Sequence, residues 1–234
     1  MDSHKHGSIT MAMIFLMSTL LAAYAPPTAE GATVVITDAV QVVNGGALNE
    51  RMAAMTADSE GNIHIVWSRN TQHLYYTMLD PRAQTVIDET QISNSGAHRA
   101  WHPDIDIDSE DRVHVTWTDK ANQHTILYTM LDPSLDDQDG SSSDDSTLSI
   151  IDDTEVSRRQ QNRDWPAIAV DSQDNVHIVW EDSYDRHDKY FQQPQIYYKF
   201  LEIDLATREA ITAIDSTLLT PIIGHKGHPD IAVD

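Results

Sequence analysis

The segment Ser183–Gln195, SYDRHDKYFQQPQ, carries residue types that suit acid–base chemistry. Its Tyr184 and His187 could move a proton, and Arg186 could neutralise a carboxylate beside the carbon that loses that proton. Tyr190 adds a second phenol. A base and a cation are what a polysaccharide lyase combines, because the cation stabilises the anion that proton removal creates. The segment occurs once in the chain, so these four residues are catalytic candidates, although no motif fixes their geometry.

A second set of residues could bind an anionic glycan. Arginine suits this task because its planar guanidinium binds a carboxylate or sulfate through two hydrogen bonds, and tryptophan offers a flat surface to a sugar ring. The candidate ligand-binding residues are Arg99, His102, Arg158, Arg159, Arg163, Trp165, Lys226 and His228. The competing interpretation is that the charged side chains pair with nearby acidic residues such as Asp164 and Asp182, and that the tryptophan fills a gap between structural units.

Motifs for other kinds of chemistry are missing from the sequence. It contains no G-x-S-x-G, no H-E-x-x-H, no glycine-rich phosphate loop and no cysteine. The acidic, serine-rich stretch 134–146 does not match a calcium-binding EF-hand loop, because Leu135 falls where the first ligand would be. We therefore predict a solvated loop there, with calcium binding as the alternative, and otherwise no metal site and no cofactor.

Composition limits the choice of partners. The chain has 234 residues, 40% of them hydrophobic, and a formal net charge of −22 at pH 7. The apolar content is sufficient for a packed domain. Such acidity argues against nucleic acid and anionic membrane surfaces as partners. A glycan or a protein remains as the expected ligand.

Residues 1–25 predict an export signal. Lys5 precedes the apolar run Met11–Ala25, which has about the length of a signal-peptide hydrophobic region and is shorter than the about 20 residues that span a membrane. The alternative is an uncleaved anchor, which would be the protein's contact with a membrane. After the polar linker 26–32, either interpretation places the chain outside the cytoplasm, secreted or at the cell surface.

Three segments of similar sequence determine where these candidates lie. Met52–Trp67 and His102–Trp117 share the pattern of Trp165–Trp180, WPAIAVDSQDNVHIVW, and a fourth copy begins at His228. Equivalent residues are 50, 63 and 63 positions apart. Self-similarity on this scale indicates a repeat architecture.

Each repeat unit predicts four strands: a short strand ending in Asp, a polar turn, an alternating strand, a third strand with paired aromatic or aliphatic residues, and a fourth strand after a loop. Four antiparallel strands per unit are typical of β-propeller blades, whereas a β-sandwich would not repeat whole units. We predict an all-β propeller with blades at 51–93, 98–157 and 161–220, the start of a further blade at 228–234, and a ring-closing strand at 33–43.

Three blades are fewer than the usual four to eight. The sequence therefore predicts either a piece of a longer protein or a ring that closes by self-association. His64, His114 and His177 recur at one position of every unit, which predicts a structural role, because a catalytic histidine is normally needed once.

The blade signature at Pro166–Trp180, P-x-I-x-V-D-S-x-x-N-V-H-I-V-W, resembles the BNR/sialidase-like propeller repeats of bacteria and archaea. The resemblance covers about Arg51 to Asp234 and implies a propeller in a secreted or surface protein. It carries over no catalytic residue, because the sialidase box S-x-D-x-G-x-T-W is not matched.

Propeller topology places the loops between second and third strands, and those between blades, on one face at the mouth of the central channel. Most of the Lys and Arg residues fall in these loops. We therefore predict a glycan- or protein-binding module with a basic channel mouth. The alternatives are a sialidase-like hydrolase or polysaccharide lyase acting on acidic glycans, and a purely structural array of blades.

Overall fold

The computed structural model describes twelve strands and one short 3-10 turn, all within the compact unit Gln41–Asp234. The described residues are 39, 41–42, 49–94, 99–121, 124–136, 148–157, 163–182, 195–220 and 227–234. The predicted export signal, the linker, the low-complexity loop beyond Asp136 and most of the ring-closing strand 33–43 lie outside this set.

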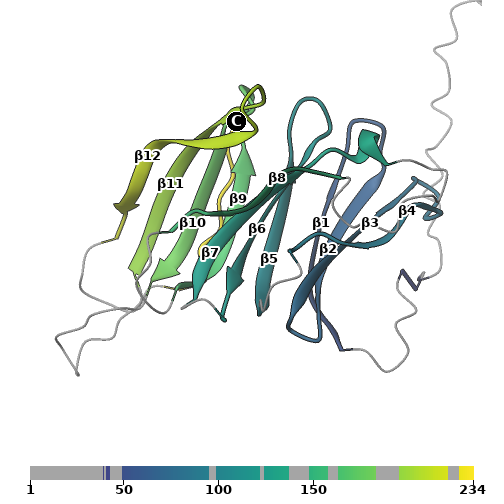
Figure 1. Ribbon diagram of the computed structural model, residues 1–234, viewed down its shortest axis with the longest axis horizontal. Helices are drawn as coiled ribbons and strands as arrows, with labels where there is room; N and C mark the ends of the chain where they lie inside the picture. Colours follow the sequence, from purple (N-terminus) through teal and green to yellow (C-terminus); the bar gives the residue numbers. More distant parts are fainter. Residues whose placement is uncertain are drawn as a thin grey trace, which may run out of the picture. The chain divides into compact units, whose positions relative to one another are not determined.

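The strands form three antiparallel sheets, each following the order of the chain (Figure 1). The first blade consists of β1 (Glu50–Ala57), β2 (Ile63–Arg69), β3 (His73–Leu79) and β4 (Thr85–Gln91). The second consists of β5 (Ala100–Ile107), β6 (Val113–Asp119), β7 (Thr125–Leu131) and β8 (Ser149–Glu155), with the 3-10 turn η1 (Pro133–Leu135) before β8. The third consists of β9 (Arg163–Val170), β10 (Val176–Asp182), β11 (Gln195–Asp204) and β12 (Glu209–Leu218).

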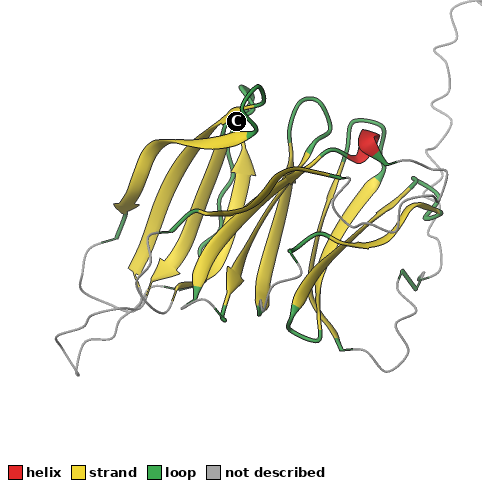
Figure 2. Cartoon of the chain, viewed as in Figure 1, coloured by secondary structure: helices red, strands yellow, loops and turns green. Residues whose placement is uncertain are grey.

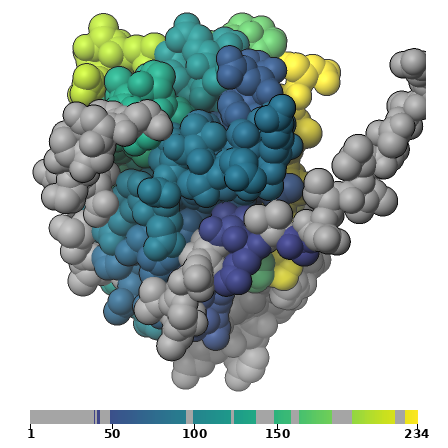
Figure 3. Space-filling view, turned by 90° about the vertical axis from the view of Figure 1, so that its right-hand side faces the viewer, coloured from purple at the N-terminus to yellow at the C-terminus, as the bar shows by residue number. Residues whose placement is uncertain are grey.

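The prediction of an all-β propeller with four-stranded antiparallel blades is confirmed. Strands dominate the described chain, and η1 is its one helical turn (Figure 2). The first strands β1, β5 and β9 lie next to one another, as the innermost strands of propeller blades do. The outer strands β4, β8 and β12 lie at the other edge of each sheet. The face that the first blade presents is the blue surface in Figure 3.

The hydrophobic core lies between neighbouring sheets. One cluster joins the first two blades and includes Val66, Tyr76, Ile105 and Trp117. A second cluster joins the second and third blades. Because β-strands alternate their side chains, each sheet buries apolar residues on the face that meets its neighbour. Packing between blades therefore places the inner strands against one another.

The recurring histidine is structural, as predicted. In the second blade the ring of His114 joins two elements: its Nδ1 lies 2.8 Å from the hydroxyl of Tyr128 on β7, and its Nε2 lies 3.1 Å from a carboxylate oxygen of Asp108. Asp108 also caps the turn before β6, accepting from the backbone N–H groups of Glu110 and Arg112. The same triad recurs in the other blades as Asp58–His64–Tyr76 and Asp171–His177–Tyr198.

The same turns also link one blade to the next. The backbone N–H and hydroxyl of Ser59 donate to the two carboxylate oxygens of Asp111, at 2.9 and 2.7 Å. Ser109 makes the same pair of bonds to Asp174, both at 2.9 Å. We call each Ser–Asp pair an inter-blade clamp. The clamps join the turns of successive blades.

Residues 227–234 carry no strand, although the sequence predicts one at 228–234. A strand needs a hydrogen-bonded partner, and none of the twelve described strands pairs with this segment. Ala39, Gln41 and Val42, which the structure describes within the predicted strand 33–43, carry no strand either. No helix in the described part of the chain is long and apolar enough to cross a membrane.

Candidate functional site

The inner strand of every repeat is irregular at the same place. The pairing between the first and second strands shifts near the start of β1, β5 and β9. The residue at the shift has a left-handed backbone, with φ of 54° at Met52, 49° at His102 and 52° at Trp165. His228, the equivalent residue of the fourth repeat, has φ of 53°. Non-glycine residues adopt this conformation rarely, so its repetition marks a built feature of the fold.

These bulges bring four side chains of different repeats into a row. The rings of His102 and Trp165 stack, with centroids 3.6 Å apart and an interplanar angle of 16°. Trp165 also contacts His228 at 4.1 Å, and the backbone N–H of His102 points to the sulfur of Met52 at 3.3 Å. We call Met52, His102, Trp165 and His228 the channel row. Trp165 remains 38% exposed although it lies between two imidazoles.

A partly buried carboxylate orients the imidazole of His102. Asp164 binds Nδ1 of His102 at 2.6 Å and Nζ of Lys120 at 2.7 Å, and that ammonium also lies 4.1 Å from the ring centre of Trp101. Burial would raise the pKa of Asp164, but the bonds from His102 and Lys120 outweigh it and hold the pKa at about 2. An ionised carboxylate only accepts, so Nδ1 of His102 carries the proton, and Nε2 is an acceptor when the ring is neutral.

A cavity of about 440 Å³ lies beside the channel row. It is lined by the bulge residues of the first three repeats and the two residues after each, at 52–54, 102–104 and 165–167, and by Pro229 and Asp230. Asp104 accepts a bond from the backbone N–H of Ile168 at 2.9 Å and so ties β5 to β9. Burial raises its pKa, and the nearby carboxylates of Asp230 and Asp106 add to the rise.

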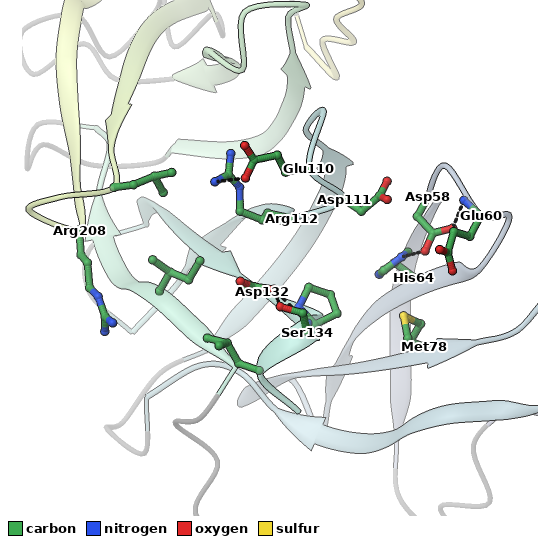
Figure 4. A pocket seen from close by; sticks show the side chains of 14 residues that line it. Asp58, Glu60, His64, Met78, Glu110, Asp111, Arg112, Asp132, Ser134 and Arg208 are labelled. Carbon is green, nitrogen blue, oxygen red and sulfur yellow. Dashed lines mark hydrogen bonds and ion pairs between the residues drawn. The ribbon is translucent and has the colours of Figure 1, made fainter. Parts of the chain in front are cut away.

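A second hollow, of about 620 Å³, lies among the turns that carry the clamps (Figure 4). Its polar groups already bind one another: Asp58 pairs with His64, and Arg112 pairs with Glu110 at 3.0 Å. Asp132 accepts from the backbone of η1. The acidic side chains of this hollow thus serve the turns that carry them. Within the described ranges, no three His, Asp or Glu side chains are grouped so as to hold a metal ion.

The structure brings together three of the predicted binding residues, His102, Trp165 and His228. Arg99 directly precedes β5 and is exposed, its carbonyl accepts from the backbone N–H of Lys120, and it does not line the cavity. Arg163 is buried instead, with Nε 3.0 Å from Asp182, as the competing interpretation expected for the charged residues. The other predicted residues, Arg158, Arg159, Tyr184, Arg186, His187, Tyr190 and Lys226, lie outside the described residues.

Sequence reasoning missed several members of this site. Met52 could have been found, because it aligns with Trp165 in the repeat. Asp104 and Asp230 could also have been found, because both follow a His-Pro pair in equivalent repeats. The bond that orients His102 joins β5 to β9 across 62 positions of the chain, and no local pattern announces it.

No protein-family model matches the sequence, and no curated protein sequence matches it. Among solved structures the chain is similar to a thermostable family-43 glycoside hydrolase, with 12% identity and a TM-score of 0.46 over 75% of this chain and 54% of that one. It is also similar to a PL25 ulvan lyase, with 11% identity and a TM-score of 0.41 over 69% of this chain and 41% of that one. A third similar structure is an exo-1,5-α-L-arabinanase from a bovine ruminal metagenomic library, with 12% identity and a TM-score of 0.41 over 72% of this chain and 53% of that one.

The chain thus spans about half the length of the first of these structures, and less of the ulvan lyase. Similarity at this level says nothing of the activity of this protein. The propeller assignment rests on the sheets themselves, on their adjacent first strands and on the repeated clamps.

Proposed function

We propose that this chain is a binding propeller that holds a glycan at the channel row. The observation that carries the proposal is the exposed indole of Trp165, set between His102 and His228 by left-handed bulges. Backbone strain of this kind persists where the surrounding structure enforces it, and it often lies at binding sites. Aromatic rings match the apolar faces of sugars, and the ring nitrogens can bond to hydroxyl groups.

The size of the cavity beside the row supports this proposal. Small-molecule sites measure roughly 300–1,000 Å³, and a cavity of about 440 Å³ lies in that range. The apolar run at the N-terminus supports an extracytoplasmic location, where surface glycans are found. We propose that the chain works there as a secreted or surface-anchored module. A protein ligand at the same row is the alternative within the binding class.

A glycan-active enzyme is the second candidate, and one observation favours it. His102 lines the cavity, and Asp164 fixes its tautomer, as the carboxylate does in an acid–base dyad. Nε2 is then a proton acceptor when the ring is neutral. Sialidase-like hydrolysis or lyase chemistry would both need such a group. We favour binding because Asp104, the buried carboxyl of the cavity, is already bonded to the backbone of β9.

Replacing Trp165 with alanine tests the binding site. We expect the affinity for a bound oligosaccharide to fall about 30-fold, since truncation of a central aromatic residue costs about 2 kcal/mol. Isothermal titration against a panel of oligosaccharides measures it. Leu205→Ala removes a side chain of similar exposure, 43%, in the turn between β11 and β12 and should leave affinity unchanged.

The outcomes separate the candidate functions. Equal affinity in Trp165→Ala and the parent protein would refute the channel row as the glycan site. New reducing ends or unsaturated products, lost in His102→Gln, would establish an enzyme in place of a binding module. Failure of every oligosaccharide to bind would favour a protein ligand or a structural array of blades.

A further inference from the structure

Apart from the indole N–H of Trp165, the polar side chains that line the channel cavity are acceptors of hydrogen bonds. Asp104 and Asp230 are the carboxylates among the described residues that line it. A carboxylate offers lone pairs and no donor. When its ring is neutral, His102 adds a third acceptor at Nε2, because its Nδ1 donates to Asp164.

No described cation offsets these carboxylates inside the cavity. Lys120 is committed to Asp164 at 2.7 Å, and Arg163 to Asp182 at 3.0 Å. Neither side chain lines the cavity. The basic mouth expected from the sequence is therefore neutralised locally at both of these positions.

The cavity already disfavours one more negative charge. Burial raises the pKa of Asp104, and repulsion from Asp230 and Asp106 raises it further, although backbone N–H groups, including that of Ile168, oppose the rise. The carboxylate of a uronate or sialate placed there would meet the same repulsion. A hydroxyl group or an ammonium group would instead donate to these oxygens, and an ammonium group would also be attracted to the indole of Trp165.

We propose that the channel cavity selects glycans that present hydrogen-bond donors and no anionic group, namely neutral sugars and above all sugars with a protonated amine. This inference rests on the proposed function and names the ligand class of the same site. It departs from the anionic glycan expected from the sequence, an expectation that rested on the basic residues Arg99, Arg158, Arg159, Arg163 and Lys226.

The test compares three oligosaccharides of equal length with the 234-residue chain: a glucosamine oligomer at a pH where its amines are protonated, its N-acetylated neutral counterpart, and an oligogalacturonate. Isothermal titration at about 0.15 M salt limits long-range attraction, which matters because the chain carries a net charge of −22. We expect the neutral oligomer to bind at least tenfold more tightly than the galacturonate, and the glucosamine oligomer to bind most tightly.

A matched pair of variants assigns the preference to the cavity. Asp230→Asn should reduce the ratio of the affinities for the glucosamine oligomer and the galacturonate at least fivefold. Asp88→Asn removes the same charge from an exposed position on β4 and should leave that ratio unchanged. Trp165→Ala should lower the affinity for all three oligosaccharides.

Each result supports or overturns a distinct claim. A galacturonate that binds most tightly, with its affinity lost in Trp165→Ala, would refute the donor preference and leave glycan binding intact. Equal effects of Asp230→Asn and Asp88→Asn would show that the preference comes from net charge, which also refutes the inference. A further outcome is that none of the three binds while another oligosaccharide binds through Trp165. In that case a neutral or amine-bearing oligosaccharide supports the inference, and an anionic one overturns it. If no glycan binds at all, the proposed function itself fails.

Discussion

At the scale of single residues, backbone conformation decides which side chains reach the channel. Met52, His102, Trp165 and His228 have different chemistry but the same left-handed φ, between 49° and 54°. Each such residue costs of order 1–3 kcal/mol unless its surroundings compensate. Here the rings stack on one another and His102 bonds to Asp164. The side chain at this position can therefore vary between repeats without changing the blade that presents it.

The triads show residues of the opposite kind, constant in every blade. Burial would raise the pKa of Asp108, but bonds from His114 and Arg112 overcome it and hold the pKa at about 2. Asp58 and Asp171 also have a lowered pKa, against the effect of burial, because they accept from the Asn of their turn and from the triad histidine. All three carboxylates stabilise the fold only while they are ionised.

Replacing Asp108 with asparagine should therefore change the acid stability of the protein. A folded-state pKa of about 2, below the reference value of 3.8, contributes roughly 2 kcal/mol that is fully present above pH ~4 and lost as the pH falls toward 2. We expect Asp108→Asn to lower the free energy of unfolding at pH 7 and to flatten its decline between pH 4 and 2. Urea denaturation at several pH values measures both effects.

The exposed Asp88→Asn variant is the control for that experiment. Its unfolding free energy should follow the pH profile of the parent protein. An Asp108→Asn profile as steep as that of the parent would contradict a stabilising role for the ionised Asp108.

At the scale of elements, the hairpin turn between the first and second strands has two structural roles. The turn is closed by its own Asp, and it also holds the neighbouring turn through the inter-blade clamp. Asp111 and Asp174, which accept the clamp bonds, have φ of 60° and 62°. The first blade has Gly61 at this position, with φ of 83°, so its turn has no carboxylate that could accept the bonds of a clamp.

Removing one clamp hydroxyl tests this role of the turn. Ser109→Ala loses the bond to Asp174 at 2.9 Å, and we expect the free energy of unfolding to fall by about 1 kcal/mol. Ser172 occupies the same position in the third blade, and its hydroxyl bonds within its own turn, to Gln173. Ser172→Ala should therefore cost clearly less in the same urea titration. Equal losses would show that the hydroxyls act within their turns.

At the scale of the whole molecule, the two end faces of the described array differ from its interior. Ile105 and Ile168 are 6% and 5% exposed between blades, whereas Met55, their equivalent in the first blade, is 69% exposed. Ile87 and Ile151 are 2% and 3% exposed, whereas Ile214 on β12 is 47% exposed. Each end face thus presents the apolar residues that an adjoining blade covers elsewhere.

We expect the 234-residue chain to self-associate through these faces. The end face of one copy can cover the opposite end face of another, as neighbouring blades cover each other within the chain. Sedimentation velocity over a range of concentrations measures the association. Met55→Glu should shift the protein toward monomer at a given concentration. Leu135→Glu adds the same charge at a residue that is 47% exposed in η1 and should have no such effect. A parent chain that stays monomeric throughout would contradict the expectation.

Local periodicity was sufficient to predict the blades and the structural role of the recurring histidines. A strand pattern and a turn each involve residues that are close in sequence, and repetition multiplies the signal. Residue type, together with the loop face that propeller topology predicts, identified His102, Trp165 and His228 as binding candidates. The described residues 227–234 carry no strand, since a strand depends on a hydrogen-bonded partner as much as on its own residues.

Whether each candidate residue is buried in an ion pair or exposed in the channel row depends on contacts between segments far apart in the chain. Arg163 and Trp165 are two positions apart, yet one is buried against Asp182 and the other is exposed in the channel row. Residue types and the predicted propeller topology indicated a basic mouth. In the folded chain Lys120 pairs with Asp164, and carboxylates line the cavity. Charge balance at a site is a sum over neighbours in space, and only the folded chain decides which residues those neighbours are.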